Sequence, residues 1–328
     1  MGGDHAPQVT VQGAVEAARE HGVEVLLVGR ESLLRRELSR FGTVRGVHIV
    51  DAPEVVGMDE PPVTPVRQKK ESSMAVALRL MRDGLAGAFV SAGNTGAAMV
   101  AAKLILGTLA GVDRPALAAP VPNVSGQTLL VDAGANVDCK PKHLLEFAIM
   151  GHFYSHLVFG VPSPRVGLLS NGEEQGKGDR VTVAAYELLS DARLGFVGNV
   201  EGRDIFAGTV DVVVCDGFVG NVVLKTAEGL GEMVVKLLRQ EAKRMPLSAV
   251  GFLLAKGALA SFKRRVDYAE YGGAPLLGVR GAVLIGHGRS NAKAIRNALR
   301  FAHRFAHSGV VGAIEERLSR LHLEENGG

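Results

Sequence analysis

Short apolar runs alternate with helical patterns along almost the whole chain. In Ser72–Asp83, for example, Met74, Leu78 and Met81 share one helical face, and Arg79 lies on the opposite face. Strands are expected at Val23–Val28, Val47–Ala52, Gly87–Ser91, Leu117–Val121, Thr128–Asp132, Arg165–Ser170, Leu194–Gly198, Val210–Asp216 and Ala282–Gly286. Alternating strands and helices indicate right-handed βαβ units. We therefore predict an α/β fold with a mostly parallel sheet, flanking helices and two lobes around a cleft.

Four of the apolar runs stop abruptly at a polar, glycine-containing turn before the next helical pattern begins. These segments are Phe89–Gly96, Leu130–Asn136, Leu168–Glu174 and Val213–Asn221. The carboxyl ends of parallel strands line one crevice, so turns far apart in sequence can meet around one ligand. Glycine permits close backbone approach, and helix N-termini attract anions. The repeated turns therefore predict a phosphate or carboxylate site.

Two segments interrupt the α/β pattern. Ala52–Pro65 contains four prolines and is expected to be a long loop. Met245–Arg265 combines apolar residues with cations, which is typical either of an interfacial helix or of a dimer-forming helical hairpin. We interpret residues 1–328 as one α/β unit in which 239–265 form an amphipathic helical segment. Its candidate contact residues are Leu247, Val250, Phe252, Leu253, Leu254, Phe262, Lys263, Arg264 and Arg265.

Composition excludes several classes of protein. With 328 residues, 47% hydrophobic and 22% charged, the chain can bury a large core. A net charge of +3 is too small for a typical nucleic-acid binder. Cys139 and Cys215 form no CxxC pair, which fits a reducing cytosol and argues against a zinc site. No signal peptide or membrane-spanning run is visible, so we expect a cytoplasmic protein.

Two turn residues are the first candidates for catalysis. Lys177 lies between glycines in the Asn171–Gly178 turn, and holding such a lysine still is costly unless a ligand fixes it. Asn221 lies at the head of a helical pattern, where it is either an N-cap or a ligand-binding amide. The resemblance of the lysine turn to a phosphate-binding P-loop is superficial, because Asp179 follows Gly178.

The remaining candidates keep alternative interpretations. Cations before the helix at Ser72 suit a docked anion or a solvated face, and Asn94 and Thr95 suit a ligand or a helix cap. Asp132 could bind Mg²⁺ or organise an internal hydrogen-bond network; no further acid cluster completes a metal site, so no metal or cofactor is expected. His287 is a base or a structural histidine. The candidate substrate residues are Asp4, His5, Lys69, Lys70, Ser91, Asn94, Thr95, Asp132, Asn136, Asn171, Gly172, Glu173, Asp216 and Gly217.

Taken in order, these segments closely resemble the PlsX family of bacterial phosphate acyltransferases. The matching blocks are Met1–Pro7, Lys69–Met74, Ser91–Ala97, Val131–Asn136, Ser170–Glu174 with Lys177–Gly178, and Asp216–Asn221. The resemblance implies a fold like that of isocitrate and isopropylmalate dehydrogenases. It also implies transfer of an acyl group from acyl carrier protein to inorganic phosphate, giving acyl phosphate for phospholipid synthesis.

The resemblance carries further expectations about partners and chain structure. Family members are expected to be cytosolic homodimers that attach to the inner face of the cell membrane. They supply a downstream glycerol-3-phosphate acyltransferase, and 239–265 would also contact the carrier protein. Relatives normally have a short apolar strand directly before the Met1–Pro7 turn. Without it, one interior strand of the sheet would be absent.

The chemistry of this reaction agrees with the residue types. Phosphate is already a nucleophile, and the leaving thiolate has a conjugate acid with a pKa of about 8.5. The enzyme must mainly hold phosphate and the developing oxyanion together. We assign that task to Lys177 and Asn221. A dehydrogenase of related fold and a non-catalytic membrane scaffold are the rival interpretations.

Overall fold

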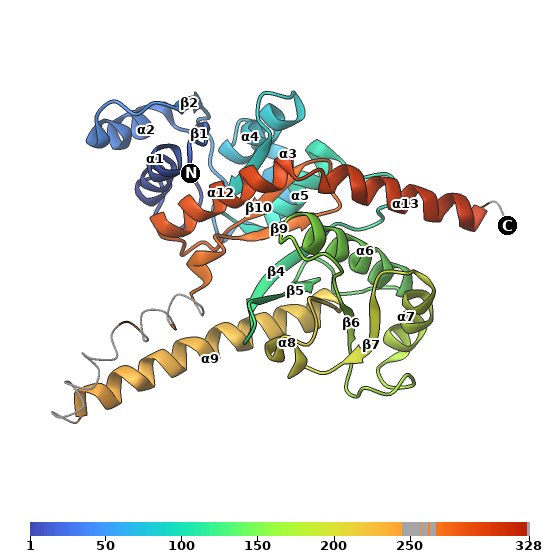
Figure 1. Cartoon of the computed structure of the whole chain (residues 1–328). Coiled ribbons are helices and arrows are strands. Elements are labelled where there is room, and N and C mark those ends of the chain that lie inside the picture. Colours follow the sequence, from blue (N-terminus) through green and yellow to red (C-terminus); the bar gives the residue numbers. More distant parts are fainter. Residues whose placement is uncertain (245–256, 258–261, 263–266, 327–328) are drawn as a thin grey trace.

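The computed structural model describes residues 1–244, 257, 262 and 267–326 (Figure 1). The strands are β1 Val25–Gly29, β2 Val47–Asp51, β3 Ala88–Ser91, β4 Ala116–Pro122, β5 Gln127–Val131, β6 Val166–Leu169, β7 Phe196–Val200, β8 Val212–Val214, β9 Ala274–Leu277 and β10 Ala282–Ile285. The α-helices are α1 Gln8–His21, α2 Glu31–Leu38, α3 Val63–Gln68, α4 Ser73–Arg82, α5 Thr95–Leu106, α6 Pro141–Leu157, α7 Arg180–Asp191, α8 Asp204–Ala207, α9 Gly217–Arg244, α12 Ala292–His307 and α13 Val310–Asn326. Short 3-10 helices span Ser39–Phe41 and Tyr268–Glu270.

The main sheet has eight strands in the order β3-β10-β9-β4-β5-β8-β6-β7, and β1 and β2 form a separate parallel pair. The pairs β3–β10, β5–β8, β8–β6 and β6–β7 are parallel. The pairs β10–β9, β9–β4 and β4–β5 are antiparallel. Helices flank this mixed sheet, so the predicted α/β class with mostly parallel strands is confirmed.

The antiparallel section corrects one premise of the sequence interpretation. Following the pairing across β9 and β4, strands β3 and β10 run opposite to β5, β8, β6 and β7. Their carboxyl ends therefore lie at opposite edges of the sheet, not along one crevice. Turns at the two opposite edges of the sheet can contribute to one site only if another element extends from one edge to the other.

Most predicted elements are confirmed, and two details were wrong. Every predicted strand forms with ends within two residues of those expected, and the helix predicted at Ser72–Asp83 is α4. Strand β9 was missed, because it has four residues, includes Pro275 and lies between glycines. The expected loop Ala52–Pro65 ends early, because α3 begins at Val63 with Pro65 in its first turn, where proline is tolerated.

The largest core cluster surrounds α6. This helix is apolar on nearly all sides, as expected for a fully buried helix, and Phe147, Ile149 and Met150 are 0% exposed. It packs against β5, β8 and α13. A second cluster lies between α4, α5 and strands β3, β9 and β10. The two clusters hold the strands that carry the polar turns.

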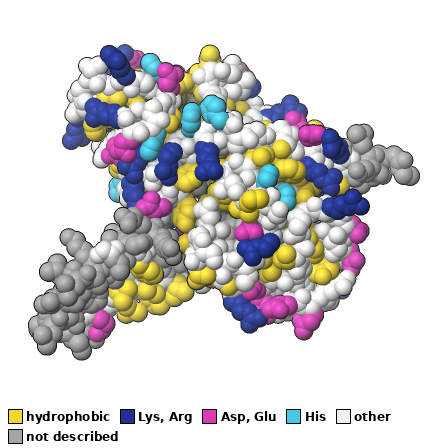
Figure 2. Space-filling view, viewed as in Figure 1, with side chains coloured by type: hydrophobic (Ala, Val, Ile, Leu, Met, Phe, Trp, Pro, Cys, Tyr) yellow, Lys and Arg dark blue, Asp and Glu magenta, His cyan; other side chains and the backbone are white. Residues whose placement is uncertain are grey.

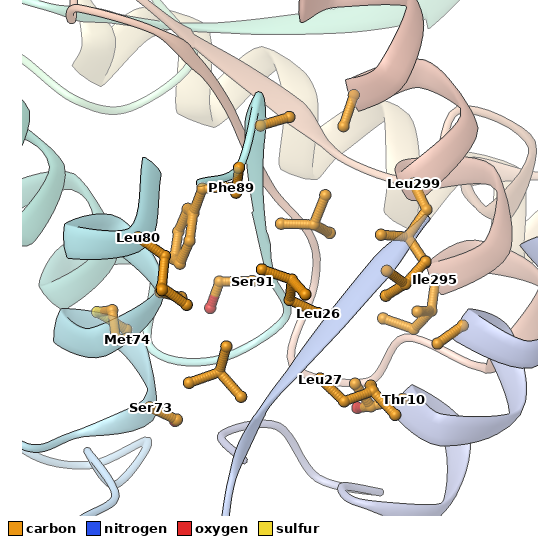
Figure 3. Close-up of a pocket in the computed structure, with 18 of the residues that line it drawn as sticks. Thr10, Leu26, Leu27, Ser73, Met74, Leu80, Phe89, Ser91, Ile295 and Leu299 are labelled. Atoms are coloured by element: carbon orange, nitrogen blue, oxygen red, sulfur yellow. The ribbon is translucent and has the colours of Figure 1, made fainter. Parts of the chain in front are cut away.

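A cavity of about 350 Å³ separates β1 from β3 (Figure 3). Residues of both strands, α4 and α12 line it, and they are mainly apolar: the residues shown include Leu26, Leu27, Met74, Leu80, Phe89, Ile295 and Leu299. Among the strands that the structure describes, β1 pairs with β2 alone and β3 with β10 alone. Met1 lines the same cavity, and burial lowers the pKa of its amino group to about 6.

Helix α9 extends away from the rest of the protein (Figure 1). Large apolar side chains remain exposed along it, including Leu230 at 54%, Met233 at 50% and Leu237 at 50%. Hydrophobic side chains gather on this helix in the space-filling view (Figure 2). Of the contact residues predicted within 239–265, only Phe262 is described, and it is 41% exposed. Leu247, Val250, Phe252, Leu253, Leu254, Lys263, Arg264 and Arg265 lie outside the described residues.

Candidate active site

The turn after β5 is organised around the carboxylate of Asp132, which is 0% exposed. Its Oδ1 accepts backbone hydrogen bonds from Leu117, Gly134 and Ala135, and its Oδ2 accepts two from Asn136 at 2.7 and 2.9 Å. Burial raises the pKa of Asp132, and these donors lower it in part. The carboxylate is fully used by donors of its own turn and by Leu117 of β4. Asp132 therefore builds an internal network, in which the Asn136 Nδ2 also donates to the Pro115 carbonyl at 2.8 Å.

The first turn of α9 packs directly on this network. The Gly217 N–H donates to the Asn136 carbonyl at 2.7 Å. A Cβ on Gly217 would lie 2.6 Å from that same oxygen, and a Cβ on Gly220 would overlap the Asp132 carbonyl oxygen. Both glycines are therefore required by close packing of the helix against the turn.

Asn221 is not the N-cap of α9. Asp216 caps the helix instead, because its Oδ1 accepts from the Phe218 and Val219 N–H groups at 2.8 and 3.0 Å. Asn221 lies one turn further on, is exposed, and makes no side-chain hydrogen bond to any described residue. Its Cγ would be 3.6 Å from a Cβ on Gly134, so it stands beside the Asp132 turn. An amide with free donors and acceptors is thus held at the end of β8.

A second group forms where the N-terminal turn meets the turns after β3 and β10. The Asp4 N–H donates to the Gly288 carbonyl at 2.9 Å, and Gly2 packs against Gly93. The side chains of Asp4 and His5 belong to exposed residues. Of these three segments, the turn after β3 is the one that belongs to the four turns expected to meet around a ligand.

Several candidates in this second group are occupied by internal contacts. The Asn94 amide donates to the carbonyls of Gly57, Met58 and Glu60, and its Oδ1 caps α5 by accepting from Ala97. The Lys69 ammonium binds Glu60 at 2.6 Å. The Ser91 hydroxyl accepts from the Gly93 N–H. Lys70 and Thr95 are exposed. Asn94 and Lys69 therefore shape the 57–60 loop, which agrees with the capping interpretation.

Helix α9 extends from the Asp132 turn to the second group, which contains the turns after β3 and β10. Lys225, one turn after Asn221, contacts the Nε2 of His287 and the Oε2 of Glu228, both at 2.9 Å. Arg289 pairs with Glu232 at 2.9 Å. Burial raises the pKa of Glu228, but hydrogen bonds from His287 and Lys225 outweigh it and lower the pKa to about 2. This network fastens α9 to the turn after β10.

Sequence reasoning missed Lys225, Glu228 and Arg289. The signal available was the spacing of Asn221, Lys225, Glu228 and Glu232 along one helical face, opposite the apolar stripe. Such charged faces are common on exposed helices, so the spacing alone did not single them out.

The third turn, Asn171–Gly178, follows β6. Lys177 is exposed, and its ammonium has no hydrogen bond or ion pair to any described residue. Its backbone N–H donates to the Glu174 carbonyl at 3.0 Å, and Gly178 adopts a φ of 114° that favours glycine. Glu173 pairs with Arg203 at 2.8 Å, Asn171 is exposed, and Gly172 is buried beside the Lys177 stem.

The described residues provide no direct hydrogen bond or ion pair between the Asn171–Gly178 turn and the other two groups. The turn nevertheless lies at the same sheet edge as Asn221, because β6 and β8 are neighbouring parallel strands. Lys177 and Asn221 therefore lie in the segments that follow two adjacent parallel strands, each with free polar atoms. Within the described part of the chain, no group of three or more His, Cys, Asp and Glu side chains is placed to hold a metal ion. None of the described helices is long and apolar enough to span a membrane.

Solved structures share this fold. A phosphotransacetylase from Streptococcus pyogenes aligns with a TM-score of 0.61 at 19% identity, covering 91% of each chain. A branched-chain phosphotransacylase from Enterococcus faecalis V583 aligns with a TM-score of 0.58 at 16% identity, covering 94% of this chain and 97% of the other. The fold is thus the α/β fold of the phosphotransacylases.

Sequence comparison is more specific. The family model described as "Fatty acid synthesis protein" matches residues 1–312. A phosphate acyltransferase of Pelotomaculum thermopropionicum is 53% identical over 328 residues, covering 100% of this chain and 96% of that protein. A phosphate acyltransferase of Citrifermentans bemidjiense is 54% identical over 321 residues, covering 97% of this chain and 91% of that protein. The chain belongs to the PlsX family of phosphate acyltransferases, and it is an enzyme of the acyltransferase class.

Proposed function

We propose that this enzyme transfers a fatty acyl group from acyl carrier protein to inorganic phosphate. The observation that supports this best is the pair Lys177 and Asn221. Both side chains are exposed, lack internal partners among the described residues and lie in the segments that follow the adjacent parallel strands β6 and β8. A free ammonium and a free amide are suited to bind an anion and a developing oxyanion.

The reaction requires no covalent intermediate on the enzyme. A phosphate oxygen attacks the thioester carbonyl carbon, an oxygen–carbon bond forms, and the carbonyl oxygen takes up negative charge. The carbon–sulfur bond then breaks, giving acyl phosphate and a thiolate that takes a proton from solvent. Lys177 neutralises charge on phosphate, and Asn221 donates to the oxyanion. The buried Asp132 network and the close contact of Gly217 and Gly220 hold Asn221 in place for this step.

The surface of the protein and the family resemblance support a set of proposed partners. The exposed apolar stripe of α9, with Leu230, Met233 and Leu237, supports a homodimer or contact with lipid. The cations and apolar residues of 239–265 fit an acidic carrier protein and the inner face of the cell membrane. The product would pass from there to glycerol-3-phosphate acyltransferase. We assign the enzyme a cytoplasmic location with peripheral membrane attachment.

The experiment is an assay of free carrier-protein thiol released from acyl carrier protein, with and without phosphate. Release should require phosphate, and Lys177→Ala and Asn221→Ala should each reduce kcat by about a hundredfold or more. Matched controls are Lys103→Ala and Thr226→Ala, which remove exposed side chains outside the site. If both site variants turned over like their controls, the assignment of these residues would be wrong. Release that ignores phosphate would remove the proposed reaction.

A further inference from the structure

Asn199, in β7, is a buried amide next to the Lys177 turn, and no motif in the sequence singled it out. The residue is 6% exposed. Its Nδ2 donates to the Glu174 carbonyl at 2.8 Å and to the Lys177 carbonyl at 3.4 Å. One side chain thus binds both ends of the short segment that precedes Gly178. We propose that Asn199 is a positioning residue that fixes the Lys177 turn for reaction.

The orientation of this amide is set by its surroundings. Turning it over would point Oδ1 at two carbonyl oxygens, which repel it, so Nδ2 must face the turn. The Oδ1 atom is then buried without a hydrogen-bond partner among the described residues. A buried polar atom left in this way is costly and needs a compensating reason. Holding the backbone of the lysine turn supplies that reason.

An irregularity in β7 directs Asn199 toward the turn. Val166 pairs with Phe196, but Gly167 pairs with Gly198, so Val197 is an extra residue in the strand. One extra residue reverses the face to which every later side chain points. Gly198 adopts a φ of 100°, which favours glycine at this bulge. The bulge therefore places Asn199 on the side where Glu174 and Lys177 lie.

The Lys177 turn needs such an anchor. Glycines flank Lys177, and the segment makes only one backbone hydrogen bond of its own, from Lys177 to Glu174. Two outer contacts also hold the turn: the pair of Arg203 and Glu173, whose side chains are 63–70% exposed, and the hydrogen bond from Gln175 to Glu187 at 2.8 Å, which joins exposed residues. Exposed contacts of this kind restrain the turn weakly. Asn199 is the buried restraint. The inference rests on the proposed role of Lys177, but the restraint itself can be measured without turnover.

The first test is limited trypsin cleavage after Lys177, followed by mass spectrometry. Asn199→Asp keeps the shape of the side chain but removes the donor, and Asn199→Ser is a milder second variant. Both should increase the cleavage rate after Lys177 by about fivefold or more, because opening of the turn becomes easier. The matched control is Asn297→Asp, which removes an equally buried amide donor, 2.8 Å from the Ala269 carbonyl, away from the site. It should leave cleavage after Lys177 unchanged.

The second test is a double-mutant cycle on kcat. Asn199→Asp should lower kcat by about 10- to 100-fold in the wild-type background. In the Lys177→Ala background it should have almost no further effect, because it acts through Lys177. Asn297→Asp should lower the melting temperature without changing kcat. A purely structural role of Asn199 predicts equal losses in both backgrounds.

The outcomes separate this inference from the proposed function. Unchanged cleavage after Lys177 in both Asn199 variants, or equal kcat losses in both backgrounds, would overturn the inference. A wild-type enzyme without phosphate-dependent release would refute the proposed function, and the cleavage rates alone would then decide whether Asn199 restrains the turn.

Discussion

Replacing Gly220 by alanine tests whether close packing of α9 positions the site. A Cβ at this position would overlap the Asp132 carbonyl oxygen, and it would lie 2.9 Å from the carbonyl carbon and 3.0 Å from Cys215 Sγ. Asp132 cannot yield easily, because it is buried and its carboxylate accepts five hydrogen bonds. The helix must therefore retreat by more than about 1 Å to restore an ordinary contact distance. Asn221, the next residue, moves with it.

Gly229 provides a matched control in the same helix. It has nothing within 4 Å of a new Cβ, so alanine there gains only helix propensity. We expect Gly229→Ala to raise the free energy of unfolding by about 1 kcal/mol. Gly220→Ala has the same gain in helix propensity, but overpacking should outweigh it and lower the free energy of unfolding by about 1–3 kcal/mol. A displacement of about 1 Å at a catalytic group should also lower kcat by about a hundredfold.

Both quantities are accessible with the purified enzyme. Urea unfolding followed by circular dichroism gives the free energies of unfolding, and phosphate-dependent thiol release gives kcat. The reasoning is refuted if Gly220→Ala is as stable as Gly229→Ala, or if it retains full turnover. Loss of stability with normal turnover would show that the contact stabilises the fold without positioning Asn221.

Three further predictions concern the ion network and the α9 region. The pKa of Glu228 is lowered to about 2, so the ionised Glu228 carboxylate stabilises the fold above pH 4.5, and this stabilisation is lost as the pH falls from about 4.5 to 2. The difference in melting temperature between the wild type and Glu228→Gln should therefore shrink over that pH range. A constant difference would contradict the ion network. If the proposed homodimer forms through α9, Leu230→Glu with Met233→Glu should convert it to a monomer in analytical ultracentrifugation, because charges would be buried in the contact. A mass unchanged from that of the wild type would exclude this stripe as the interface. Leu253→Glu with Leu254→Glu should abolish co-sedimentation with anionic vesicles and leave the dimer intact, whereas unchanged co-sedimentation would exclude this membrane contact.

Local sequence patterns were sufficient to predict the strands and the class of fold. Apolar runs of strand length were visible for every strand except β9, where only Ala274–Leu277 is extended and proline interrupts it. Strand direction was not visible, because it depends on which strands become neighbours. The three consecutive antiparallel pairs β10–β9, β9–β4 and β4–β5 place the turns at two edges, which no local pattern indicates.

The sequence identified the turns better than the roles of their side chains. Lys177 and Asn221 were singled out, and the structure leaves both with free polar atoms. Asp132 and Asn94 have the same residue types but are used internally, because distant segments supply their partners: Leu117 for Asp132 and the 57–60 loop for Asn94. Asn199 could not be found from sequence, since its role depends on a bulge that reverses the face of β7.

The most direct test of the proposed reaction follows the oxygen atoms of phosphate. The enzyme is incubated with acyl carrier protein carrying an acyl chain and with phosphate labelled with ¹⁸O at all positions, and the acyl product is analysed by mass spectrometry. Direct attack predicts an acyl phosphate that retains every labelled oxygen, formed in step with free carrier-protein thiol. Release of unlabelled fatty acid in place of acyl phosphate would contradict the account.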